Sequence, residues 1–165
     1  AKAGVVLDEM RIDPDKAIEA AVAEYRRQGK SEEWINTRLI STSVRVFFTE
    51  AFARSQKVKP SGFQFAQITD TIRMGVWKRN TKTIREQLAI KKIDNVRDHL
   101  TIFGLMYEAI AEERSGVALQ AESELNFDQA NQIVKGKAEL VGKQADEMSR
   151  DLGIDLVTNK PLLEE

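Results

Sequence analysis

The sequence predicts an all-α protein, a bundle of about five to seven helices with a central buried helix near residues 96–114. Helix-capping residues repeatedly precede apolar runs, and within those runs apolar residues recur three and four positions apart. No segment alternates apolar and polar residues for long enough to indicate a strand. A hydrophobic fraction of 42% with 31% charged residues fits a real core under strongly charged outer faces.

The first two expected helices are marked by their starts. Asp13 followed by Pro14 suits a capping residue and a first helical position, and Gly29 ends the helix. Ser31 caps the second helix, whose first turn is acidic as the helix dipole favours. Within it, the hydroxyl residues 41–43 predict a weak point, because short polar side chains compete for backbone hydrogen bonds.

The remainder divides at Pro and Gly. We expect a helix over residues 63–77, a short helix capped by Asn80 through residue 90, a turn at 91–95, the central helix, and a last helix over 127–152. Residues 115–116 are expected to end the central helix, and 117–125 are ambiguous. Gly136 and Gly142 interrupt the last helix and are interpreted as local contacts or a kink. The predicted organisation is an N-terminal helical pair (1–56), a loop (57–62), a helical core (63–153) and an extended tail (154–165), either one compact domain or a piece of a longer chain.

The central helix is predicted from its apolar spacing. Val96, Leu100, Phe103, Tyr107 and Ile110 recur every four or three residues, which places them on one broad buried face. Together with the apolar run at 44–52, this face exceeds what one small domain can cover. Self-association or a protein partner is therefore expected.

Composition excludes several function classes. There is no Cys and only one His, so thiol chemistry, disulfides and an all-imidazole metal site are absent, and no catalytic residue, metal or cofactor is assigned. No apolar stretch reaches the length of a membrane span, so a cytoplasmic, non-enzymatic protein without membrane contact is expected. The net charge of −1 means that any nucleic-acid site must be local.

One segment supplies such a local charge. Between residues 73 and 92, seven cations are opposed only by Glu86. The cations, which are the candidate DNA-phosphate contacts, are Arg73, Lys78, Arg79, Lys82, Arg85, Lys91 and Lys92. Asn80, Thr81 and Thr83 add neutral donors at a helix start.

Other interpretations of this segment stay open. It is a solvated basic face, or it pairs with acidic residues that follow, namely Glu108, Glu112, Glu113, Glu122 and Glu124. The succession of short helix, turn and long helix also loosely resembles a helix-turn-helix. Trp34 and Trp77 are alternatively base-stacking residues or edges of the core.

Residues 95–99 form the densest polar cluster. Asn95 is expected to cap a helix, Arg97 and Asp98 to form buried or inter-helix ion pairs, and His99 to hydrogen-bond at the edge of the core. Adjacent helical residues do not share a face, so Asp98 cannot orient His99 for acid–base catalysis. A structural role is therefore predicted.

Several pieces of sequence carry a family resemblance. They are residues 3–7, 25–31, 33–39, 68–70, 81–82, 95–100 and 109–112. Read in order, these pieces resemble the C-terminal region of prophage antirepressor proteins of the BRO type and of the related DNA-damage-inducible D-like proteins. The resemblance implies a phage- or stress-linked regulator that acts on DNA or on DNA-bound protein. No BRO-type DNA-binding domain is present, so the alternative is a homo-oligomerisation or protein-interaction domain without nucleic-acid contact.

Overall fold

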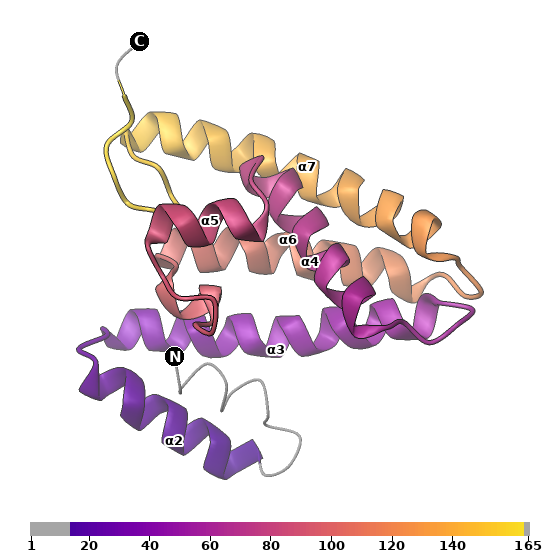
Figure 1. The fold of residues 1–165 in the computed structure, drawn as a ribbon, viewed down its shortest axis with the longest axis horizontal. Coiled ribbons are helices and arrows are strands. Elements are labelled where there is room, and N and C mark those ends of the chain that lie inside the picture. The colour runs from indigo at the N-terminus through magenta and orange to yellow at the C-terminus, as the bar shows by residue number, and fades with distance from the viewer. Residues whose placement is uncertain (1–13, 164–165) are drawn as a thin grey trace.

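The computed structural model describes residues 14–163, which form an all-α bundle with 74% helix and no strand or sheet (Figure 1). The predicted fold class is confirmed. The helices are α2 (Pro14–Arg27), α3 (Glu32–Ser55), α4 (Gly62–Trp77), α5 (Thr81–Leu88), the 3₁₀ helix η1 (Val96–His99), α6 (Ile102–Gln120) and α7 (Phe127–Leu152). Asp13, the expected cap of the first helix, lies outside the described residues.

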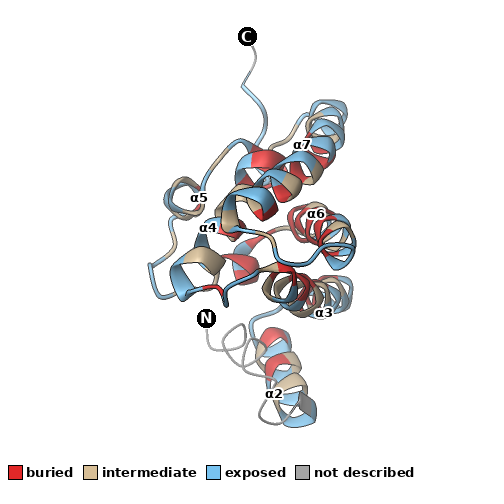
Figure 2. Ribbon diagram, turned by 90° about the vertical axis from the view of Figure 1, so that its right-hand side faces the viewer, coloured by how far each residue is buried: buried red, intermediate tan, exposed pale blue. Residues whose placement is uncertain are grey.

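The helices pack in two layers. α3, α6 and α7 lie side by side, and α2 packs beneath α3 (Figure 2). α4 crosses α6 and α7 on one side of this layer, and α5 lies outermost on that same side (Figures 1 and 2). Because α3 packs along α6, the N-terminal helical pair shares one core with the rest of the bundle.

Most helix starts follow from local capping. Five side chains each accept a hydrogen bond from the backbone amide three residues further along the helix that they begin: Ser31, Ser61, Asn80, Thr101 and Asn126. The predicted caps Ser31 and Asn80 are confirmed, and α7 begins and ends where the sequence predicts. These bonds satisfy amides that have no partner inside the helix.

The predicted central helix over 96–114 is wrong in its bounds. Residues 96–99 form one 3₁₀ turn, Leu100 is extended, and α6 begins only after the cap Thr101. The indole of Trp34 donates to the carbonyl of Leu100 at 2.9 Å, so this carbonyl is engaged by a side chain from α3. The Thr101 hydroxyl accepts from the Gly104 amide and donates to the carbonyl of Leu156 at 2.6 Å. Partners distant in sequence therefore fix the break.

The buried face of α6 also differs from the expected one. It consists of Gly104, Leu105, Glu108, Ala111, Glu112, Ser115, Gly116 and Leu119. Phe103 and Ile110, predicted to be buried, are 37% and 40% exposed. The helix does not end at residues 115–116 as predicted but continues to Gln120, and Gly116 lets the ring of Phe47 pack where a Cβ would clash.

The predicted weak point at residues 41–43 is absent, since α3 is continuous there. Thr42 donates its hydroxyl to the carbonyl of Arg38, and the Arg38 guanidinium donates back to that hydroxyl at 2.7 Å. Ser41 and Thr42 are both buried. The hydroxyl thus bridges the helix backbone to a buried cation instead of interrupting the helix.

Gly142 makes a close contact, which is one of the two interpretations that the sequence offered. A Cβ on Gly142 would collide with the carbonyl of Gly75 in α4, and a Cβ on Gly75 would collide with Ala138 in α7. The two helices therefore touch backbone to backbone. Gly136 has nothing within 4 Å of an added Cβ, so the interpretation as a local contact does not fit it.

Candidate nucleic-acid interface

The basic segment divides into arginines that hold the fold and lysines that face water. Arg73 is only 3% exposed, and its Nε lies 3.3 Å from both carboxylate oxygens of Glu108. Its Nη1 donates to the hydroxyl of Thr81 at 2.9 Å, and the Trp77 indole donates to Glu108 at 2.9 Å. Arg73 is therefore wrong as a candidate phosphate contact, because its hydrogen-bonding capacity is directed into the core.

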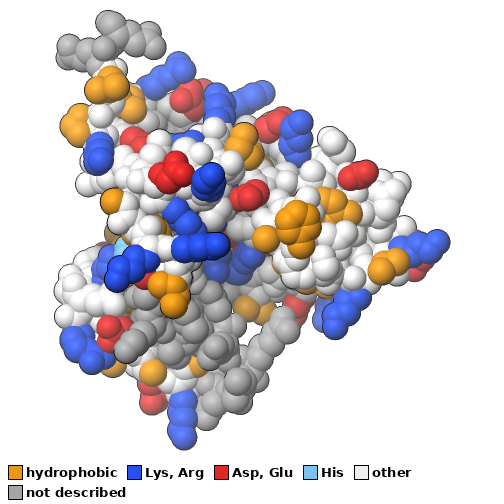
Figure 3. All heavy atoms as spheres, viewed as in Figure 1, with side chains coloured by type: hydrophobic (Ala, Val, Ile, Leu, Met, Phe, Trp, Pro, Cys, Tyr) orange, Lys and Arg blue, Asp and Glu red, His pale blue; other side chains and the backbone are white. Residues whose placement is uncertain are grey.

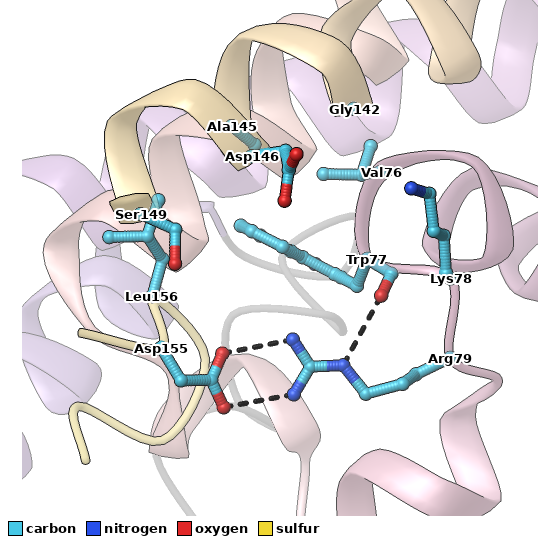
Figure 4. A pocket seen from close by; sticks show the side chains of 10 residues that line it. All are labelled: Val76, Trp77, Lys78, Arg79, Gly142, Ala145, Asp146, Ser149, Asp155 and Leu156. Carbon is cyan, nitrogen blue, oxygen red and sulfur yellow. Dashed lines mark hydrogen bonds and ion pairs between the residues drawn. The ribbon is translucent and has the colours of Figure 1, made fainter. Parts of the chain in front are cut away.

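Arg79 anchors the C-terminal segment. Its two terminal nitrogens meet the two oxygens of Asp155 at 3.0 and 2.9 Å, and its Nε donates to the carbonyl of Trp77 at 3.3 Å (Figure 4). Burial raises the pKa of Asp155, but hydrogen bonds from Arg79, Thr158 and the Val157 amide outweigh it and hold the pKa at about 2. This forked pair ties the start of α5 to the chain beyond α7.

Arg85 closes the turn that follows α5. Its Nη1 donates to the carbonyl of Lys91 at 3.2 Å and to the carbonyl of Asp94 at 2.5 Å. The carboxylate of Asp94 in turn accepts from the Lys91 amide at 3.0 Å. Arg85 thus shapes residues 91–94 and presents Lys91 and Lys92 beside α5.

The four lysines of the segment remain exposed, and we call them the lysine face: Lys78, Lys82, Lys91 and Lys92. Within residues 14–163, none of the four forms an ion pair. Figure 3 shows basic side chains gathered over α5 and the turn after it, on the side of the bundle that faces the viewer. The four lysines thus lie on α5 or on the turns that flank it, and Glu86 is the one acidic residue of the segment.

The start of α5 is not a preformed anion cradle. The Thr81 amide donates to Asp70 at 2.9 Å, and the Thr83 amide donates to Asn80 at 2.8 Å. The Thr81 hydroxyl also donates to Asp70. Since Asp70 is already an anion at the helix N-terminus, the expectation that Thr81 would help to bind a phosphate is wrong.

The helix-turn-helix and base-stacking interpretations also fail. The element after the turn is a 3₁₀ turn with buried residues, and the exposed face of α6 carries apolar side chains such as Phe103, Met106 and Ile110, which do not suit a DNA groove. Trp34 and Trp77 are 6% and 8% exposed, and their indole nitrogens donate to internal acceptors. They are edges of the core.

The acidic residues after 107 do not cover the lysine face. Glu108 pairs with Arg73 inside the bundle, and Glu112 pairs with Arg45 of α3 at 3.5 Å. Burial raises the pKa of Glu112, although Arg45 and Arg97 counteract part of this effect. Two of the five acidic residues are thus internal, and in the described part of the chain none pairs with a lysine of the face.

The cluster at residues 95–99 is structural in its contacts. The Asn95 side chain accepts from the Arg97 amide at 3.0 Å and caps η1. Asp98 is buried and accepts from the Tyr25 hydroxyl at 2.6 Å and from Arg38 Nε at 3.1 Å. Arg97 is buried, whereas His99, predicted at the edge of the core, is exposed.

The partners of Asp98 escaped prediction from the sequence. Tyr25 and Arg38 lie 73 and 60 residues away, and nothing in the local pattern of α2 or α3 distinguishes them as members of a polar cluster. The described residues contain no group of three or more His, Asp or Glu side chains that could hold a metal ion. Across residues 14–163, no helix combines the length and apolarity needed to cross a bilayer.

Comparison with known proteins adds no family. No protein-family model matches the chain, and neither does any curated protein or solved structure. The lysine face and the buried ion pairs are therefore interpreted on their own geometry.

Proposed function

We propose that this chain is a non-enzymatic regulatory module that binds nucleic acid through the sugar-phosphate backbone, with the lysine face as the contact surface. The observation that carries the proposal is the separation of roles within the basic segment. Its arginines hold internal acceptors, while its four lysines are exposed and make no ion pair among the described residues. Exposed clustered cations release counterions when they meet phosphates, and this release drives binding.

The chemistry of the face favours binding that is independent of sequence. Reading base edges in the major groove depends mostly on forked, bidentate donors, of which arginine is the main example. A lysine ammonium acts as a compact point charge and suits phosphate oxygens. Since Arg79 and Arg85 are engaged within the fold, the face offers charge without the geometry for base recognition.

The resemblance to BRO-type antirepressors and DNA-damage-inducible D-like proteins supports the regulatory part of the proposal. A regulator of phage or stress genes acts where DNA is present, and a weak backbone contact adds to the affinity of a separate recognition domain. In this proposal the module helps to hold a separate recognition domain on DNA. Its own affinity lies in the non-specific range, with Kd about 10⁻⁴ to 10⁻⁶ M at physiological salt.

The test replaces all four lysines of the face by alanine and measures binding to labelled duplex and single-stranded DNA at several salt concentrations. The unsubstituted chain should show a linear fall of log affinity with log salt. The variant should lose up to about 0.9 of slope per lost contact on duplex DNA and about 0.7 on single strands. The loss should be the same for unrelated DNA sequences.

The matched control removes four other exposed lysines and so changes net charge equally. These residues are Lys57, Lys59, Lys135 and Lys143. If the lysine face makes the phosphate contacts, the control variant should keep most of the slope of log affinity against log salt. Equal losses in both variants, or no salt-dependent binding by the unsubstituted chain at low ionic strength, would contradict the proposal.

A further inference from the structure

In the described part of the chain, a stripe of partly exposed apolar side chains runs along the outer face of α6. Phe103, Met106, Ile110 and Val117, which we call the α6 stripe, are 37%, 46%, 40% and 42% exposed. Their spacing of three, four and seven residues places them in line along the helix, as in the contact seam of paired helices. Phe48, Phe52, Val96 and Leu100, which were expected to contribute to an interaction surface, are buried in the core instead.

α3 widens this surface. Ile40 is 61% exposed and lies beside the stripe. The groove between the two helices is lined by Thr37, Ile40 and Val44 from α3 and by Met106, Ala109 and Ile110 from α6. Both helices belong to the layer that lies opposite α5 (Figure 2).

We propose that the α6 stripe and this groove form a homodimer interface, in which α6 packs antiparallel against α6 of a second copy. Ile40 and the α6 stripe leave roughly 400 Å² of apolar surface in water, about the size of the largest patch on a typical monomer. Two copies would bury about 800 Å² of this apolar surface, and the polar residues around it would supply the rest of the roughly 1,200 Å² at which stable interfaces begin. This inference goes beyond the proposed function and does not depend on it.

The two ends of the α6 stripe are symmetric about Ile110, so two copies of the stripe can pack against each other. Ile110 lies midway between Phe103 and Val117, so a two-fold axis through Ile110 places Phe103 of one copy opposite Val117 of the other. Such an isologous contact uses the same surface twice. The same register brings Met106 across from Arg114, whose long aliphatic stem can cover an apolar neighbour.

Glu113 decides between the two helix directions. It borders the groove between Ile110 and Val117, so parallel helices in register would bring two Glu113 carboxylates together. In the antiparallel arrangement the two carboxylates are six residues apart along the axis, or about 9 Å. The opposed helix dipoles also favour this direction.

The absence of native cysteine makes the geometry testable by cross-linking. A cysteine in place of Ile110 lies on the two-fold axis and should form a disulfide-linked dimer under mild oxidation. In Phe103→Cys the two thiols lie 14 residues apart along the pair, about 21 Å, which is too far for a disulfide. Mixing Phe103→Cys with Val117→Cys should restore the cross-link as a mixed dimer.

Leu140 provides the control, because it is 58% exposed on α7 and lies outside the groove. Sedimentation should show a concentration-dependent dimer for the unsubstituted chain and for Leu140→Glu, and a monomer for Ile110→Glu with unchanged circular dichroism. A strict monomer at high micromolar concentration would overturn the dimer. Self-linking of Phe103→Cys without self-linking of Ile110→Cys would overturn the antiparallel register. No nucleic acid enters these measurements, so their failure leaves the proposed function untouched.

Discussion

Substituting alanine for Gly142 should destabilise the fold, whereas the same substitution at Gly136 should stabilise it. Both glycines lie in α7, where Ala is intrinsically preferred over Gly by about 1 kcal/mol. At Gly136 an added Cβ meets nothing within 4 Å, so this preference should appear almost in full. Gly136→Ala should therefore raise the free energy of unfolding by about 0.5–1 kcal/mol.

At Gly142 the added methyl would overlap the carbonyl of Gly75, a backbone atom that cannot rotate away. α4 and α7 would have to separate along an interface where Val76 and Val141 are buried beside the contact. Overpacking of this kind costs about 1–3 kcal/mol, and backbone displacement places it at the upper end. After the helix-propensity gain, a net loss of about 2 kcal/mol is expected for Gly142→Ala.

Urea denaturation and thermal denaturation, both followed by circular dichroism, measure the free energy of unfolding and the Tm of each variant. For a chain of this length, a loss of about 2 kcal/mol corresponds to a Tm about 4–8 °C lower. Gly136→Ala should show a Tm higher by about 2 °C. If both substitutions change stability in the same direction, the backbone contact between α4 and α7 does not limit the packing of these helices.

Three further changes test the ion pairs within the fold. Asp98→Ala leaves the Arg38 guanidinium buried without its carboxylate, and urea denaturation should show a loss of about 3–5 kcal/mol; a loss below 1 kcal/mol would contradict the pairing. The pKa of Asp155 is lower in the fold, at about 2, than in the unfolded chain, so its contribution is present above the unfolded pKa and is lost as pH falls toward 2. Comparison with Asp155→Asn should therefore show about 1–2 kcal/mol disappearing between pH 5 and 2, and an unchanged difference would contradict the role of Arg79. Burial raises the pKa of Glu112, so the chain loses stability as pH rises above the pKa of this group in the unfolded chain. The stability of Glu112→Gln should therefore increase relative to that of the unsubstituted chain between about pH 4 and 7. A difference that stays constant with pH would contradict this prediction.

The helix starts were predictable because capping is local. Ser31, Asn80 and Asn126 each bond an amide only three residues ahead, and this spacing can be read directly from the sequence. The ends of α2 and α7 at Gly29 and Gly153 are equally local, since both glycines adopt a positive φ. Local hydrogen bonds and apolar spacing thus determined the all-α class and most element bounds.

The central helix shows where local pattern failed. Its apolar spacing continues from Val96 to Ile110, yet the chain breaks at Leu100 because Trp34 and Leu156 engage the backbone and the cap there. Those partners lie 66 and 55 residues away from the groups that they bind. The spacing of apolar residues predicts which face of a helix is buried. It does not predict which backbone groups will hydrogen-bond to side chains that are distant in sequence.

The candidate interface divides in the same way. The sequence by itself determined that seven cations gather between residues 73 and 92, because this is a matter of composition. Only the tertiary structure decided that Arg73 and Arg79 bind Glu108 and Asp155, which lie 35 and 76 residues further along the chain. A buried charge is stable only beside a counter-charge, and the fold decides which residues lie close enough to supply one. The packing of helices distant in sequence therefore decides which cations of the segment are paired inside and which remain exposed.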